Sequence, residues 1–263
     1  MLKAKRPSIP VQPARDVLAD KVALVTGASR GIGRAIAEHL ARDGAFVFVN
    51  FHTAKREAAD CIAAIRAAGG AAEAIRADIS KQPQVRRMFD SIRKRAGRLD
   101  ILVGNAGIAP IANELVRVTP KMWNETFSVN VTGAFLCAQA AVPLLRRSKG
   151  GRMIFIGSAA SRLGGTIGPH YAASKAALSG LVEYLSRALG RYAITVNIVE
   201  PGFVATELSS SLHRGAANVR AMRQAVPLGR VGTVKEIAAA VAFLAAPNAS
   251  YITRQNLAVT GGR

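Results

Sequence analysis

A glycine-rich turn between a strand pattern and a helix pattern limits this chain to few architectures. Val22–Val25 is a short apolar run with two valines, and it leads directly into the turn Thr26–Gly33. Apolar residues then recur at helical spacing from Ile36 to Leu40, and a second apolar run follows at Phe46–Val49. A strand, a turn, a helix and a second strand within about 30 residues form a βαβ unit, whose strands pair in parallel. The sequence therefore predicts an α/β protein.

The glycines of this turn are suited to binding a phosphate group. Residues without Cβ let the backbone approach a pyrophosphate closely, and the N-terminus of the following helix offers unpaired N–H groups to its charge. We therefore expect the turn to bind a dinucleotide. The alternative is a tight turn that binds no ligand. The residues expected to contact the cofactor here are Gly27, Ser29, Arg30, Gly31, Ile32 and Gly33.

The end of the second strand bears on which dinucleotide binds. A cofactor without a 2′-phosphate usually meets an acidic residue there, but this chain has Asn50-Phe51-His52. With no carboxylate in place, and with Arg30, Lys55 and Arg56 expected nearby, a phosphate would be tolerated. NADP(H) is therefore preferred over NAD(H). The alternative is that Lys55 and Arg56 only begin the solvated face of the next helix.

Strand and helix patterns alternate to the end of the chain. Further strands are expected near Glu73–Arg76, Asp100–Val103, Met153–Ile156, Ile194–Val199 and Leu257–Val259. Helices are expected at about Lys55–Ala68, at about Gln84–Ala96, from Pro120 with a break or bend near Pro143, from Tyr171, and at about Val234–Ala246. This alternation predicts one doubly wound domain with a parallel sheet, in which ligands bind at the carboxyl ends of the strands.

Polar residues stand at several of these strand ends. Asn105-Ala106-Gly107 follows one strand and Ser158 follows another. Asp78 follows the third strand, where its carboxylate would accept from an adenine amino group or cap the next helix. Asn130 lies in the middle of an apolar helix, where an unused amide costs free energy, so we predict that its amide is functional. The polar stretch 209–211 is a candidate lid.

Tyr171 and Lys175 are four residues apart at the start of a helical run, so both side chains lie on one face. A tyrosine has a pKa of about 10 unless a nearby cation stabilises its phenolate. We expect Lys175 to be that cation and to lower the pKa of Tyr171. Such a tyrosine can exchange a proton with an alcohol or carbonyl oxygen. The alternative is a packed tyrosine beside a solvated lysine.

The net charge of +20 is the unusual bulk property of the 263 residues. It concerns partners rather than fold, and it is compatible with nucleic acid, with an acidic substrate or carrier, or with an arginine-rich composition on a solvated surface. The basic residues are scattered and no nucleic-acid-binding motif occurs, so nucleic acid is not an expected partner. No metal site is predicted.

Other features of the sequence concern the domain organisation and the cellular compartment. Residues 1–20 are basic and contain prolines, so we expect a disordered or extended tail, followed by one domain over 21–263. No apolar run approaches the roughly 20 residues that a spanning helix needs, so we expect no membrane span, and no signal sequence is expected. Cys61 and Cys137 are expected to be buried in helices, which fits a reducing compartment such as the cytoplasm.

Together these motifs resemble the short-chain dehydrogenase/reductase family over residues 21–263. The matching features, in order and spacing, are Thr26–Gly33, Asn105-Ala106-Gly107, Asn130, Ser158, Tyr171 with Lys175, and Pro201-Gly202. Pro227–Arg230 and Ala249–Thr253 look most like the 3-oxoacyl-[acyl-carrier-protein] reductase branch. The resemblance implies a Rossmann-like parallel sheet of about seven strands, NADP(H) as cofactor and a homo-oligomer, either a tetramer or a dimer.

The resemblance also implies roles for single residues. Tyr171 would protonate the substrate carbonyl, Lys175 would lower its pKa and hold the nicotinamide ribose, Ser158 would donate to the substrate oxygen, and Asn130 would hold a water that links Lys175 to solvent. Further implied cofactor contacts are His52, Asp78, Ile79, Asn105, Ala106, Gly107, Tyr171, Lys175, Pro201, Gly202, Val204 and Thr206. The implied reaction is NADPH-dependent reduction of a 3-oxoacyl thioester on an acyl carrier protein.

Two other functions stay open on the sequence. One is an NADP(H)-dependent oxidoreductase of free ketones, steroids, quinones or sugars, and the other is a dinucleotide-binding regulator without turnover. A basic rim of Arg146, Arg147, Lys149, Arg187 and Arg191 would steer an acidic carrier protein to the site, or else is ordinary solvated surface.

Three departures from the family pattern concern details. Glu200 stands before Pro201-Gly202 where a small residue is usual, so it would pair with a basic side chain or disturb substrate binding. Arg254 replaces a usual glycine and Thr260 replaces a usual aspartate. Both lie in the C-terminal segment that the family uses for subunit packing, so these two changes concern the assembly.

Overall fold

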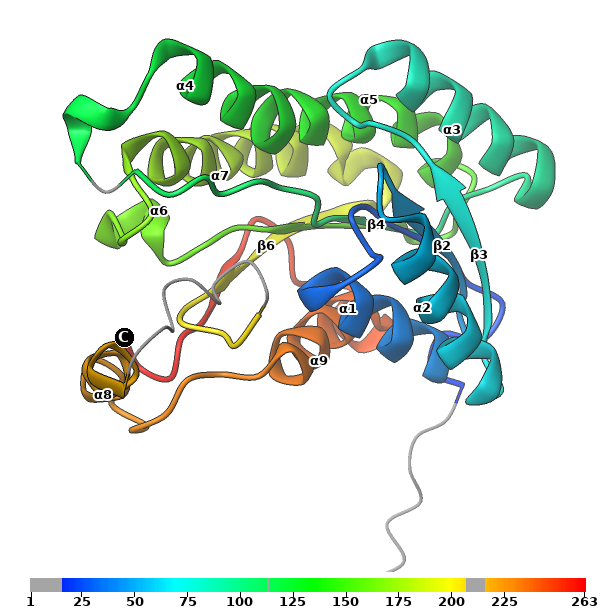
Figure 1. The fold of residues 1–263 in the computed structure, drawn as a ribbon. Helices are drawn as coiled ribbons and strands as arrows, with labels where there is room; N and C mark the ends of the chain where they lie inside the picture. Colours follow the sequence, from blue (N-terminus) through cyan, green and yellow to red (C-terminus); the bar gives the residue numbers. More distant parts are fainter. Residues whose placement is uncertain (1–15, 113, 207–215) are drawn as a thin grey trace, which may run out of the picture.

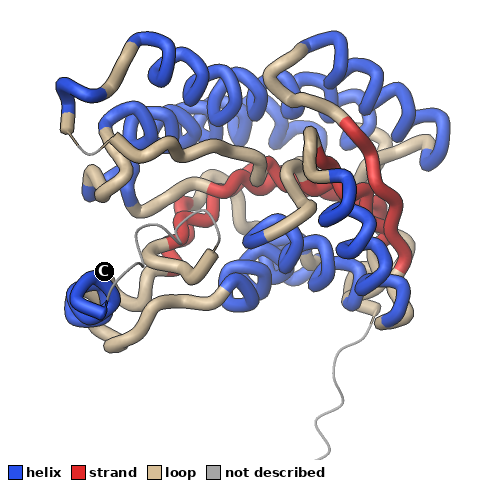
Figure 2. The backbone as a smooth tube through the Cα atoms, viewed as in Figure 1, coloured by secondary structure: helices blue, strands red, loops and turns tan. Residues whose placement is uncertain are grey.

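The computed structural model describes residues 16–112, 114–206 and 216–263. A seven-stranded sheet lies between two layers of helices (Figure 1), and the tube in Figure 2 shows the strands as the central layer. The strand order is β3-β2-β1-β4-β5-β6-β7, and every neighbouring pair is parallel. The strands are β1 Val22–Val25, β2 Phe46–Phe51, β3 Ala71–Arg76, β4 Ile101–Gly104, β5 Arg152–Ile156, β6 Thr195–Pro201 and β7 Asn256–Val259. The predicted doubly wound fold is confirmed.

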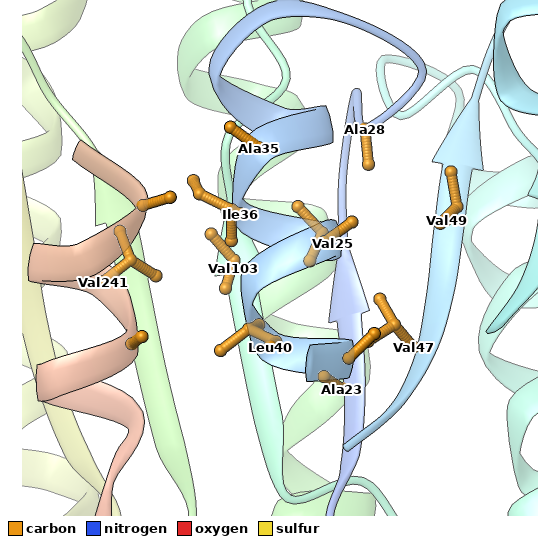
Figure 3. Close-up of a cluster of buried hydrophobic side chains, with 14 of the residues drawn as sticks. Ala23, Val25, Ala28, Ala35, Ile36, Leu40, Val47, Val49, Val103 and Val241 are labelled. Carbon is orange, nitrogen blue, oxygen red and sulfur yellow. The ribbon is translucent and has the colours of Figure 1, made fainter. Parts of the chain in front are cut away.

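One helix layer covers the face of the sheet that carries α1 (Gly31–Arg42). In Figure 1 this layer also contains α2 (Lys55–Ala67) and α9 (Val234–Ala245). Apolar side chains of α1 fill the space between β1, β2, β4 and α9, and Figure 3 shows Ile36 and Leu40 among Val25, Val103 and Val241. Their spacing is the helical pattern seen in the sequence, and burying it fixes α1 behind the glycine turn.

The second layer covers the opposite face. It contains α3 (Gln82–Ala96), α4 (Pro120–Phe127), α5 (Ala134–Leu145) and α7 (Pro169–Leu189), and α6 (Ala160–Leu163) packs against α7. Because the chain runs from β1 outward to β3 and then crosses to β4, the sheet changes winding direction between β1 and β4. A crevice at the carboxyl ends of the strands is expected at such a switch point.

The long helix after Pro120 is interrupted at a different place from the one predicted. Pro143 lies inside the last turns of α5, which ends two residues later at Leu145. The irregularity is instead a π-helical segment at Ser128–Gly133, centred on Asn130. A polar side chain that bonds elsewhere, rather than the proline, therefore alters the helix. The helix α8 (Ala216–Gln224) was not predicted at all.

One residue of the segment before β1 is anchored in the domain. Leu18 is fully buried, and its backbone N–H donates to the Asp43 carbonyl at 2.8 Å. Leu18 therefore packs on the domain, whereas the other residues of the segment 16–20 are exposed. The rest of the predicted tail and the candidate lid at 209–211 lie outside the described residues.

Within the described residues, one helical run has the length and apolarity of a membrane span, which the sequence analysis did not anticipate. It is Pro120–Leu145, with a mean hydropathy of 1.4 in its most apolar window. Half of that window is buried inside the fold, as is usual for a core helix. The run therefore gives weak support for a membrane span.

Arg254 stands at a position that favours glycine. Its φ of +66° is in the left-handed region, which explains why a glycine is usual there. The Arg254 side chain forms an ion pair with Glu183 of α7. Arginine in place of glycine therefore adopts an unfavourable backbone conformation here, but its side chain links α7 to the segment before β7.

Candidate active site

A cavity of about 420 Å³ lies at the carboxyl edge of the sheet. It is bounded by the glycine turn, the ends of β2 and β3, the loop after β4, the segment from β5 to α7, and the end of β6. The predicted site residues that line it are Gly27, Ser29, Arg30, Gly31, Ile32, Gly33, His52, Asp78, Ile79, Asn105, Ala106, Gly107, Ser158, Tyr171, Lys175, Pro201, Gly202, Val204 and Thr206. Asn130 is the one predicted residue that lies behind the wall.

Two amide side chains, one of them buried, hold the glycine turn in place. Asn50 at the end of β2 accepts from the Gly27 N–H at 3.2 Å, while its own amide donates to the Ala77 carbonyl at 3.1 Å. From the other side, Asn105 Nδ2 donates to the carbonyls of Thr26 (2.9 Å) and Gly27 (3.0 Å). The turn is therefore preorganised by the strands on both sides of β1.

The turn and α1 fit the pyrophosphate of a dinucleotide. No side chain caps the N-terminus of α1 and its first turn has no acidic residue, so its unpaired N–H groups are available to an anion. A Cβ built on Gly31 would meet no protein atom within 4 Å. A Cβ on Gly33 would lie 2.4 Å from Asn105 Nδ2, so this glycine is required by packing.

The end of the cavity near β2 and β3 contains His52 and Asp78. Burial would raise the pKa of Asp78, but the Ser80 hydroxyl and N–H bond to its carboxylate and lower the pKa overall. Lys55 and Arg56 begin α2, are exposed and do not line the cavity, which favours the alternative that they belong to the solvated face of this helix. Arg30 does line it, and Arg76 Nε donates to the His52 carbonyl at 3.1 Å.

Asn130 uses its whole amide to fasten the loop after β4. Its Oδ1 accepts from the Ile108 N–H at 2.8 Å, and its Nδ2 donates to the Ile108 carbonyl and to Ser174 Oγ, both at 3.0 Å. A Cβ built on Gly107 would lie 3.1 Å from Asn130 Oδ1 and 3.5 Å from Lys175 Nζ. The predicted importance of this amide therefore has a structural basis: it joins the loop, the π-helical segment and α7.

Tyr171 and Lys175 are both buried and both line the cavity. The Lys175 ammonium lies 5.8 Å from the centre of the Tyr171 ring and donates to the Ile156 carbonyl at 2.8 Å. Burial lowers the pKa of Lys175 to about 8. The ammonium is thus still charged at neutral pH, and two of its three N–H donors remain for a ligand.

The predicted direction of the Tyr171 pKa is wrong in this structure. Burial raises the pKa of the phenol, and a hydrogen bond with Ser158 opposes that shift in part. Desolvation of the phenolate is the largest cause of the shift, and the Lys175 ammonium, 5.8 Å from the ring centre, does not offset it. Ser158 Oγ in turn accepts from the Ala160 N–H at 3.1 Å, which orients the hydroxyl.

Glu200 pairs with a basic side chain, which was one of its two expected behaviours. It is fully buried at the end of β6, where Ser161 Oγ donates to Oε1 at 3.1 Å. Arg162 Nη2 lies 2.9 Å from Oε2, and the Arg162 side chain is 58% exposed. The carboxylate therefore holds two consecutive residues of α6, three and four positions after Ser158.

The predicted basic rim is not at the cavity. Arg146 follows the end of α5 and stacks on the Tyr192 ring at 4.1 Å, while Arg147 donates to the Gly97 carbonyl. In a βαβ unit a helix returns the chain to the amino end of the next strand, so residues at helix C-termini lie at the edge opposite to the ligand. None of the five predicted rim residues lines the cavity.

Some site residues were missed in the sequence. Asn50 was noted only because it is not a carboxylate, although a buried asparagine at a strand end signals a structural amide. Ser174 donates to the Tyr171 carbonyl at 2.8 Å and so links Asn130 to the tyrosine. Phe203 and Arg263 also line the cavity, and no local pattern marks them. Among the described residues, no group of three His, Cys, Asp or Glu side chains is placed to hold a metal.

A family model described as enoyl-(acyl carrier protein) reductase matches residues 27–263. The chain belongs to the short-chain dehydrogenase/reductase family, as its motifs predicted, and this is a family of oxidoreductases. It is 38% identical to the 3-oxoacyl-[acyl-carrier-protein] reductase FabG of Staphylococcus epidermidis over 92% of this chain and 98% of that protein. It is also 38% identical to the 3-oxoacyl-[acyl-carrier-protein] reductase of Synechocystis, over 93% and 97% of the two chains.

Solved structures agree with this assignment. A short chain dehydrogenase from Burkholderia cenocepacia, in complex with NADP, is 39% identical, with a TM-score of 0.86 over 93% of this chain and 98% of that one. A putative gluconate dehydrogenase from Agrobacterium tumefaciens is 28% identical, with a TM-score of 0.89 over 94% and 97% of the two chains. Relatives of different substrate names therefore share this fold.

Proposed function

We propose that this protein reduces a carbonyl to a secondary alcohol with NADPH, and that its substrate is the 3-oxo group of an acyl thioester on an acyl carrier protein. The observation that carries the proposal is the convergence of Ser158, Tyr171 and Lys175 on one cavity beside an uncapped helix N-terminus. Two relatives with 38% identity over nearly their full length are named for this reaction.

NADPH, when bound, supplies the hydride. The glycine turn and the N-terminus of α1 would hold its pyrophosphate, and Arg30 is the basic side chain suited to a 2′-phosphate. Lys175 has ammonium donors suited to ribose hydroxyls. The absence of a carboxylate at Asn50-Phe51-His52 favours NADP(H) over NAD(H).

Tyr171 is the proton donor in this proposal. Its raised pKa keeps the phenol protonated at neutral pH, so that the proton is present when the carbonyl oxygen gains charge. Ser158 would donate to the same oxygen, and its orientation is fixed before substrate arrives because Ala160 N–H already bonds to it. The charged Lys175 would stabilise the phenolate that remains after proton transfer.

The direct test is NADPH oxidation, followed with 3-oxoacyl thioesters on an acyl carrier protein beside a panel of free ketones, steroids, quinones and sugars. We expect the carrier-bound thioester to have the highest kcat/KM. A higher kcat/KM for a free ketone would contradict the proposed substrate but leave the reductase chemistry intact.

A reductase of free carbonyl compounds is the second candidate. It is favoured by one observation: the basic residues expected to dock an acidic carrier lie at the opposite edge of the sheet. A regulator without turnover is opposed by the complete set of Ser158, Tyr171 and Lys175.

We also propose a cytoplasmic homotetramer. Both cysteines are buried and unpaired, as expected for a reducing compartment. Large apolar side chains are exposed on three helices and near β7, namely Phe135, Tyr184, Phe243 and Tyr251. Exposed apolar side chains are compatible with subunit contacts. Light scattering coupled to size exclusion would measure the mass, and a monomer would contradict the assembly.

A further inference from the structure

The charges that line the cavity are unevenly distributed. Among the described residues, the lining side chains that carry formal charge are Arg30, Asp78, Lys175 and Arg263. Arg30 and Asp78 follow β1 and β3, which form one half of the sheet. Lys175 is buried and bonds to the Ile156 carbonyl. Arg263 follows β7 and contacts the segment after β6, so it is the charge in the opposite half of the cavity.

An aromatic ring and a hydrogen bond to the backbone hold Arg263 in this position. Its guanidinium carbon lies 4.0 Å from the centre of the Phe203 ring, which lines the same cavity. Thr260 Oγ1 donates to the Arg263 carbonyl at 3.0 Å. Gly261 and Gly262 turn the chain with φ of +70° and +95°, and a Cβ on Gly261 would lie 2.7 Å from Val226. The chain therefore needs both glycines to bring the arginine to this wall.

Two acidic side chains on elements next to this part of the sheet are already paired. Glu200, at the end of β6, pairs with Arg162, and Glu236, at the start of α9, pairs with Arg230. Within the described parts of the chain, no carboxylate forms an ion pair with Arg263. Arginine on an aromatic face keeps its N–H edge available for a carboxylate or phosphate.

We propose that Arg263, supported by Phe203, is an anion subsite that selects carbonyl substrates bearing a phosphate or carboxylate group. This inference deepens the proposed function and rests on the reductase activity stated above. The anion would come either from the phosphate of a phosphopantetheine thioester or from the carboxylate of a free oxo acid. In both cases Arg263 lowers KM and takes no part in proton transfer.

Two matched substrate pairs test the subsite. The first is a 3-oxoacyl pantetheine thioester and its 4′-phosphopantetheine counterpart, and the second is methyl 4-oxopentanoate and free 4-oxopentanoate. We expect Arg263→Gln to lower kcat/KM for the anionic member of at least one pair by 10-fold or more, through KM, and to change its neutral partner by less than 2-fold. The pair that responds identifies the source of the anion.

Controls separate the subsite from other effects. Arg187→Gln removes the same charge from the exposed end of α7 and should leave both members of each pair unchanged. Arg263→Lys should retain part of the selectivity. Equal losses for neutral and anionic members, or a loss of NADPH affinity as large as the loss in kcat/KM, would overturn the proposal. If neither thioester is reduced but 4-oxopentanoate is selected through Arg263, the proposed acyl-carrier substrate is contradicted, whereas the anion subsite is supported.

Discussion

At the scale of single residues, Tyr171 and Lys175 are buried groups whose burial shifts their pKa values in opposite directions. The Lys175 pKa falls to about 8, whereas an unfolded chain keeps this proton up to its ordinary pKa of 10.5. Between these values the unfolded state binds more protons, so stability rises with pH. Tyr171 acts in the other direction, but only above its ordinary pKa of 10.

We therefore predict that Lys175 makes the protein more stable as pH rises from 8 to 10. The full effect is about 3 kcal/mol at most, since each pKa unit corresponds to about 1.4 kcal/mol. Urea unfolding at several pH values would measure it as the difference between the natural protein and Lys175→Met. Tyr171→Phe is the matched control and should keep the rise. A difference that does not depend on pH would contradict the low pKa.

Replacement of Tyr171 by Phe tests the proton donor. The ring and its packing remain, but the hydroxyl that bonds to Ser158 is lost, so we expect kcat to fall by roughly 100-fold or more. NADPH affinity, measured by fluorescence, should change by less than 2-fold. Retained turnover would refute the proposed role of the phenol.

At the scale of elements, α6 is tied to β6 through Glu200. Removing Arg162 leaves a buried carboxylate without its counter-charge, which is destabilising. Because Arg162 is half exposed, water compensates in part, and we predict a loss of about 1–3 kcal/mol for Arg162→Met. Urea unfolding would measure this loss.

The double variant Glu200→Gln with Arg162→Met gives the contrast. It removes both charges while Gln keeps an oxygen for the Ser161 hydroxyl, so we expect it to be more stable than Arg162→Met alone. Additive losses in the double-mutant cycle would mean that the ion pair does not couple these residues.

The elements also show what the sequence could and could not predict. Strand positions were predicted within a few residues, because buried parallel strands are continuous apolar runs. The irregularity in the long helix was predicted near Pro143 but lies at Asn130. A proline is a local signal, whereas the hydrogen bonds from Asn130 to Ile108 and Ser174 exist only after folding. The small, polar helix α8 has a weak local signal and was missed.

At the scale of the whole molecule, the sheet topology determines which residues lie at the cavity, and sequence spacing alone does not show this. The predicted cofactor-binding residues line one cavity because they follow parallel strands, whose carboxyl ends share an edge. The prediction that a basic rim borders the cavity was wrong for the same reason. Arg146 and Arg187 lie at the C-terminal ends of helices, and these ends are at the opposite edge of the sheet. Arg263 is distant in sequence from the catalytic and cofactor-binding motifs, and the pairing of β6 with β7 brings it to the site.

The net charge of +20 nevertheless acts on partners over the whole surface. An acidic carrier protein would be attracted from solution even without a rim at the cavity, and ions screen such attraction over about 10 Å at 0.1 M salt. We predict that kcat/KM for a carrier-bound thioester falls by roughly 10-fold or more between low and high salt. The same acyl group on neutral pantetheine should change by less than 2-fold, since it experiences no steering. Initial rates across a salt series would measure both, and parallel curves for the two substrates would exclude electrostatic recruitment of the carrier.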